Sequence, residues 1–66
     1  MAVAKTIEIV AGSATSIEDA VQTGIAKVGE TISGIEGAWV KDTKAVIRDD
    51  KVAEWRVTLA VTFIVS

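Results

Sequence analysis

The C-terminal part of the chain alternates apolar and polar side chains with the period of two that is typical of a β-strand. In the segment 52–66, Trp55 shares one face with five apolar residues, whereas the other face is mostly polar. The five are Val57, Leu59, Val61, Phe63 and Val65. At about 3.3 Å per residue the strand would be roughly 45 Å long. This exceeds the width of a compact domain of this size, so we expect the strand to curl around something or to extend into a partner.

The N-terminal half of the chain predicts a strand and then a helix. Residues 3–10 are rich in β-branched types and predict the first strand, while the small residues 11–14 predict a loop. An apolar stripe at helical spacing follows, formed by Ile17, Val21, Ile25, Val28, Ile32 and Ile35. Gly34 is expected to close this helix as a C-cap. Two pairs are candidates for a capping box at its start: Thr15 with Glu18, and Ser16 with Asp19.

The segment 37–48 predicts a second strand, which forms a hairpin with the C-terminal strand. The polar residues 49–51 make the turn, and strands joined by a short turn pair antiparallel. One face of the second strand is expected to carry Ala38, Val40 and Val46, and the other Trp39, Lys41, Thr43 and Ile47. The predicted order is therefore β-α-β-β, in a single domain that covers residues 1–66.

The size and composition of the chain favour self-association. A domain of 66 residues lies at the lower edge of independent stability, where one core rarely supplies more than about 3–5 kcal/mol. The chain has no Cys for a disulfide and no His for a zinc site, yet 50% of its residues are hydrophobic. We therefore expect subunits that are stable mainly in a homo-oligomer.

The charge distribution argues against nucleic acid and membrane partners. The net charge is −2, and the 7 basic residues form no basic stripe that could bind a phosphate backbone. No apolar run approaches the roughly 20 residues of a membrane-spanning helix. Lys5 and Glu8 interrupt the N-terminal segment where a signal peptide would be continuous. We expect a soluble, cytoplasmic protein.

The residue types present do not form a recognisable catalytic arrangement. His, Cys and Tyr are all absent, which removes the usual general bases and nucleophiles, and no glycine-rich phosphate loop is found. We expect that the protein is not an enzyme. Four acidic residues could suggest a metal site, but they lack the spacing of a calcium loop, and a solvated turn is the preferred interpretation. They are Glu36, Asp42, Asp49 and Asp50.

The two tryptophans and one arginine are the residues with most chemical interest. Trp55 lies on the apolar face of its strand and is predicted to pack in the core against the helix. Trp39 is predicted on the face that no internal helix covers, where subunit packing and ligand stacking are both open. Arg56 could bind a phosphate or carboxylate, or form an ion pair with Glu54 or Glu36 across a subunit boundary.

The whole chain resembles the dodecins, small flavin-binding proteins of bacteria and archaea. The resemblance covers residues 3–64 and rests on the loop AGSATS, the helix SIEDAVQTGIAKVGETI and the closing strand WRVTLAVTF. It implies an α+β fold in which a three-stranded antiparallel sheet partly wraps around one amphipathic helix. It also implies a hollow homododecamer that stores or protects flavin (riboflavin or FMN) and is not a catalyst.

The chain departs from this family at the positions that bind flavin. In flavin-binding members, ring pairs stack between tryptophans near a two-fold axis, and a Gln binds the ring edge. The resemblance places Gly37 at the stacking Trp, Trp39 at a Glu, and Arg56 at the Gln. Lys44 falls where many members carry Arg. Gly37 offers no aromatic plane and Arg56 no acceptor, so these four residues form an altered candidate ligand site.

Two functions are compatible with this altered site. Gly37 and Trp39 are two residues apart and face the same side, which leaves an indole roughly 6–7 Å along the strand for a displaced flavin stack. Alternatively, the shell binds no flavin, like the dodecin-like proteins described as calcium-associated. In that case the protein would be a structural shell, and any ligand would be an ion such as calcium or a phosphate-bearing cofactor.

Overall fold

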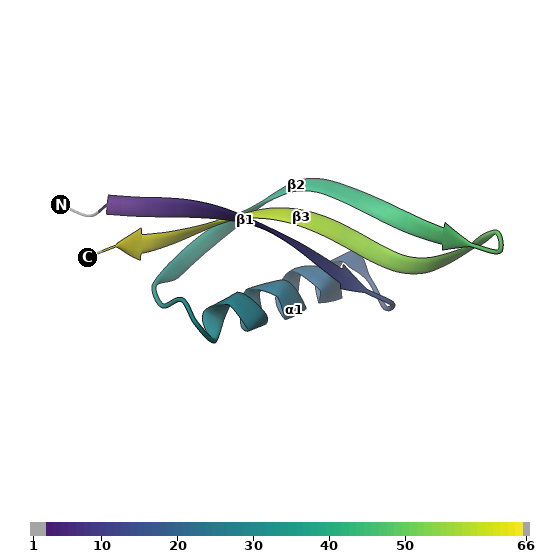
Figure 1. Cartoon of the computed structure of the whole chain (residues 1–66), viewed down its shortest axis with the longest axis horizontal. Coiled ribbons are helices and arrows are strands. Elements are labelled where there is room, and N and C mark those ends of the chain that lie inside the picture. Colours follow the sequence, from purple (N-terminus) through teal and green to yellow (C-terminus); the bar gives the residue numbers. More distant parts are fainter. Residues whose placement is uncertain (1–2, 66) are drawn as a thin grey trace.

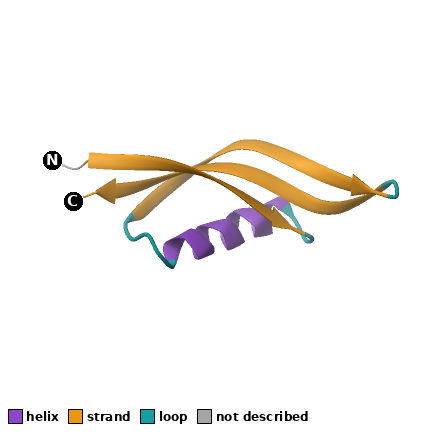
Figure 2. Ribbon diagram, in the orientation of Figure 1, coloured by secondary structure: helices purple, strands orange, loops and turns teal. Residues whose placement is uncertain are grey.

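A computed structural model describes residues 3–65 of the chain and confirms the β-α-β-β order (Figure 1). One helix lies on one face of a three-stranded antiparallel sheet (Figure 2). The elements are β1 (Val3–Ser13), α1 (Ile17–Gly29), β2 (Ile35–Arg48) and β3 (Lys51–Val65). Within residues 3–65, no helix has the length and apolar character needed to cross a membrane.

The C-terminal strand is the centre of the sheet. The strand order is β1-β3-β2, and β3 pairs antiparallel with both neighbours. The molecule measures 51 × 20 × 14 Å, whereas a helix of 13 residues is only about 20 Å long. Both ends of the sheet therefore project beyond α1 (Figure 1), in agreement with the strand length expected from the sequence.

The core lies between α1 and the middle of β3. Val57, Leu59 and Val61 are 0–1% exposed and pack with Ala20 of the helix. The partly buried residues around them are Ile7, Ile9, Ala11, Ile17, Val21, Ile25 and Ile35. Trp55 lies on the same face as Val57 but is only partly buried, so its predicted place in the core is wrong. The reason is its position at the N-terminal end of α1, beside Ile17, where little of the helix remains to cover it.

The two glycines inside α1 have different roles. A Cβ at Gly24 would lie 2.9 Å from the Cβ of Ala11 on β1, so this glycine allows the helix to approach the strand closely. A Cβ at Gly29 would meet no atom within 4 Å. Gly29 instead ends the helix, five residues before the predicted cap at Gly34.

The connection from α1 to β2 differs from the predicted one. Gly34 has a positive φ of 80°, as a C-cap would, but it belongs to the link that enters β2. Its carbonyl accepts a hydrogen bond of 2.9 Å from the backbone N–H of Ile64. This hydrogen bond joins the link to β3, and β2 begins at the next residue, Ile35, two residues before the predicted strand. Ile32 and Ile35, which were predicted in the helix, lie outside it.

The start of α1 is fixed by hydroxyl groups. Ser16 Oγ accepts a hydrogen bond of 3.0 Å from the backbone N–H of Asp19, which selects Ser16 as the N-cap. The Asp19 carboxylate does not return to Ser16; it accepts a hydrogen bond of 2.6 Å from Ser13 Oγ. Ser13 Oγ in turn accepts from the N–H of Thr15 at 2.9 Å. Ser13 is therefore the last residue of β1 rather than part of the predicted loop 11–14.

Strand β2 is irregular, and this changes which residues share a face. Val40 pairs with Leu59, and Asp42 pairs with Thr58, the neighbour of Leu59 on β3. Lys41 is therefore an extra residue of β2, which forms a β-bulge. Past the bulge, Thr43 lies opposite Val57 and Val46 opposite Glu54. Their predicted faces are therefore wrong: Thr43 is on the helix side and Val46 on the far side.

The hairpin turn contains two residues rather than three. Asp49 and Asp50 have φ values of 52° and 61°, and Lys51 already pairs with Arg48 as the first residue of β3. Two consecutive left-handed residues are characteristic of a type I′ turn, whose twist matches that of the strands. Aspartate tolerates this conformation better than most residues, so the turn has a structural reason for its acidic pair.

Candidate ligand-binding site

The face of the sheet that points away from α1 carries all four candidate residues, spread along β3 from Thr62 to Arg56. We call it the outer face; along β3 it carries Glu54, Arg56, Thr58, Ala60 and Thr62. Gly37 lies opposite Thr62, Trp39 opposite Ala60, and Lys44 opposite Arg56. Trp39 and Lys44 are an odd number of residues apart and would face opposite sides of a regular strand. The bulge at Lys41 places them on one face.

The indole of Trp39 is the most accessible aromatic surface of the site. Trp39 is 66% exposed, although it lies within a paired strand. The ammonium of Lys41 lies 5.6 Å from the centre of the indole ring, a cation–π contact. An exposed indole of this kind can stack on a flat aromatic ligand.

An ion pair crosses the outer face beside Trp39. Lys41 Nζ lies 2.8 Å from Glu8 Oε2, so this side chain reaches from β2 across β3 to β1. It can cross there because Glu8 and Trp39 both lie opposite Ala60, whose methyl group leaves room above β3. Glu8 and Lys41 are 33 residues apart in sequence. No sequence signal links them, and sequence reasoning missed both as members of this site.

A second charged group lies farther along the same face. Arg56 Nη2 forms an ion pair of 2.8 Å with Glu54 Oε2 of the same chain. Lys44 lies directly opposite Arg56 and forms no ion pair within residues 3–65. The Glu54 carboxylate already offsets the charge of Arg56, so Lys44 is the cation here to which an anion would add a partner. Such an anion would also lie near the remaining guanidinium N–H groups of Arg56.

Two glycines shape the surface around these side chains. A Cβ at Gly12 on β1 would collide with the Glu54 carboxylate, so Gly12 provides the space in which the Glu54–Arg56 pair lies. A Cβ at Gly37 would meet nothing within 4 Å. The position that resembles the stacking Trp of dodecins is therefore open, and the only aromatic plane of the outer face among residues 3–65 is that of Trp39.

The acidic residues of the described segment 3–65 do not form a cluster within one chain. Among residues 3–65, no group of three or more acidic side chains is arranged to hold a metal ion. Asp49 and Asp50 lie in the hairpin turn, and Asp42 lies opposite Thr58 in the middle of the sheet. A cation site that uses these carboxylates would need further ligands from another copy.

The fold and the outer face define a small two-layer α+β domain with one sheet face left uncovered. A family model described as dodecin matches residues 3–66, and the chain belongs to the dodecin family. A search of curated protein sequences finds no match.

Solved dodecin structures agree with this assignment. A crystal structure of a Thermus thermophilus dodecin variant has a TM-score of 0.94 and 29% identity, and the match covers 100% of this chain and 98% of that one. Dodecin from Streptomyces davaonensis, at 23% identity over 98% and 96% of the two chains, has a TM-score of 0.94 and shows the shared fold. A calcium-chelating antigen from Mycobacterium tuberculosis, called calcium dodecin, has a TM-score of 0.83 and 26% identity over 92% and 87%.

Proposed function

We propose that the chain is one subunit of a homododecameric store for a flat, phosphate-bearing aromatic molecule, with flavin as the first candidate. One observation carries this proposal: an exposed indole and two opposed cations lie on the same uncovered sheet face. Membership of a flavin-binding family supports it further. The store would act in the cytoplasm and would have no catalytic role.

The spacing of the outer face suits a ligand with a ring and a charged tail. Trp39 and Lys44 lie opposite Ala60 and Arg56, four residues apart on β3, a distance of about 13 Å. A ring stacked on Trp39 could extend a ribityl phosphate chain toward Lys44 and Arg56. Arginine binds phosphate through paired N–H groups and lysine binds it as a point charge. FMN should therefore bind more tightly than riboflavin.

A fluorescence titration of the intact, sized assembly with FMN and riboflavin tests this function. Saturable quenching of flavin fluorescence is expected, and Trp39→Ala should abolish it. Lys44→Ala should weaken FMN more than riboflavin, and added salt should do the same because it screens the charges. Trp55→Phe and Lys5→Ala are matched controls, since Trp55 and Lys5, which lies opposite Phe63, are on the helix side of the sheet. Absence of quenching by either flavin at micromolar protein would overturn the proposal.

A calcium-binding shell is the second candidate function. The similarity to calcium dodecin favours it, and the acidic turn Asp49–Asp50 offers carboxylates at the end of each hairpin. Because no acidic cluster forms within residues 3–65, such a site would combine carboxylates of neighbouring subunits. Calorimetric titration with calcium tests this candidate: binding that Asp49→Asn with Asp50→Asn removes would support it, and absence of heat would exclude it.

A further inference from the structure

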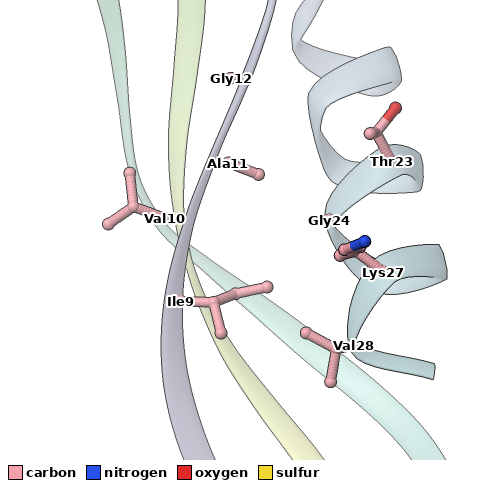
Figure 3. Close-up of a pocket in the computed structure, with 8 residues that line it drawn as sticks. All are labelled: Ile9, Val10, Ala11, Gly12, Thr23, Gly24, Lys27 and Val28. Atoms are coloured by element: carbon pink, nitrogen blue, oxygen red, sulfur yellow. The ribbon is translucent and has the colours of Figure 1, made fainter. Parts of the chain in front are cut away.

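An apolar groove lies between α1 and the free edge of β1 (Figure 3). Ile9 and Ala11 point from β1 toward the helix, and Val28 points back toward the strand. Thr23 and Lys27 line the helix side of the groove. It has a volume of about 380 Å³, and Lys27 is the only charged residue that lines it. No element of residues 3–65 covers the free edge of β1.

An apolar pair at the far end of the β2–β3 hairpin also lacks a partner. Ile47 and Val52 lie directly opposite one another in the register. They are 55% and 46% exposed, because the hairpin projects past the start of α1 (Figure 1). We call the segment 46–53 the hairpin arm. Two adjacent aliphatic side chains at the end of a projecting arm are costly to leave in water.

We propose that the hairpin arm of one copy inserts into the groove of a second copy, with Ile47 and Val52 packed against Ile9 and Val28. The charges agree with this contact, because the arm ends in Asp49 and Asp50 and the groove carries Lys27. Lys27 has only a solvent-exposed ion pair of 3.6 Å with Glu30 among the described residues. Such a pair stabilises little, so the ammonium is available to the incoming carboxylates.

The contact joins two different surfaces and therefore repeats head to tail. The arm is the end of the β2–β3 hairpin, whereas the groove lies on the far side of β1, so one chain cannot fill its own groove (Figures 1 and 3). A heterologous contact of this kind closes into a ring when the rotation between copies allows it. The contact rests on the homo-oligomer proposed above but not on its ligand.

Cysteine cross-linking tests the contact, because the chain has no cysteine of its own. Thr23→Cys marks the groove and Val52→Cys marks the arm. A short bis-maleimide reagent is added to each single variant, to the double variant, and to a mixture in which the two single variants have been refolded together. In the control pair, Val3→Cys replaces Val52→Cys. Val3 is 64% exposed and lies on β1, far from the hairpin turn. Circular dichroism checks that every variant is folded.

The head-to-tail contact predicts a distinct pattern of products. Each single variant should stay monomeric on denaturing gels, the mixture should give dimers, and the double variant should give a ladder. Dimers from Val52→Cys alone would show that two arms meet each other, and would overturn the proposal. A double variant that cross-links no better than the Val3→Cys control would overturn it as well.

A second measurement does not depend on a reagent. Ile47→Asp places a charge in the proposed contact and should cause a loss of oligomer mass in native mass spectrometry, while Val3→Asp should leave the mass unchanged. Equal masses for the two variants would contradict the contact. Flavin titration of the cross-linked ring separates the two proposals, because failure of flavin binding leaves the cross-linking pattern intact.

Discussion

Replacing Gly24 by alanine measures how closely α1 approaches β1. The new Cβ would lie 2.9 Å from the Cβ of Ala11 and 3.5 Å from the terminal methyl groups of Ile9 and Leu59. In an open helical position the same change stabilises by about 1 kcal/mol. Added atoms in a filled core instead cost about 1–3 kcal/mol, and a Cβ fixed to the backbone of β1 cannot rotate away. We therefore expect a net loss of about 1 kcal/mol, which corresponds to a melting temperature about 4–8 °C lower for a domain of this size.

Gly29→Ala is the matched control for this substitution. Gly29 lies on the same helix, but a Cβ at this position would meet nothing within 4 Å. The melting temperature of the Gly29→Ala variant should therefore stay unchanged or rise. Adding Ala11→Gly to Gly24→Ala should recover part of the loss, because it removes the contacting methyl group. Thermal unfolding by circular dichroism, at one fixed subunit concentration, compares the variants. If Gly24→Ala proves as stable as Gly29→Ala, the close packing of α1 on β1 is wrong.

Three further substitutions have defined outcomes. Leu59→Ala removes a fully buried side chain and should cost about 2–5 kcal/mol and lower the soluble yield; an unchanged melting temperature would contradict the described core. Asp50→Gly relieves a left-handed residue of the turn and should stabilise by about 1 kcal/mol, which chemical denaturation can detect as a higher midpoint. Trp39→Ala should leave the native mass of the oligomer unchanged; a smaller assembly would make Trp39 an interface residue instead of a ligand contact.

The fold was predictable where local pattern and packing agree. The alternation of β3 identified its buried face, because a central strand is covered on one side by the helix and is flanked by two strands. The hydroxyl residues Thr15 and Ser16 marked the start of α1 to within one residue, and the hydrogen bond to the N–H of Asp19 identifies Ser16 as the N-cap. The end of α1 was not predictable from the apolar stripe, because Ile32 and Ile35 continue its helical spacing. Ile35 does pack on the core, but it does so from β2.

The candidate site was predictable only in part, for reasons of register. Gly37, Trp39, Lys44 and Arg56 could be named from sequence, but nothing local reveals that Lys41 is an extra residue. A bulge depends on how β2 meets β3, not on the composition of β2 alone. The contact of Lys41 with Glu8 depends in turn on the order of the strands, which places β1 and β2 on either side of β3.

The bulge at Lys41 also affects how safely the sheet can expose its edges. β2 is an edge strand, and an exposed edge is a template for unwanted strand pairing between molecules. Its pairing with β3 is irregular at three points, and one of these carries a lysine, so a further strand would find neither continuous hydrogen-bond donors nor a flat surface. β1 has an unbroken register over its whole length and lacks this protection. Aggregation of free subunits should therefore begin at β1, and a charge or proline placed on that edge should slow it more than the same change on β2.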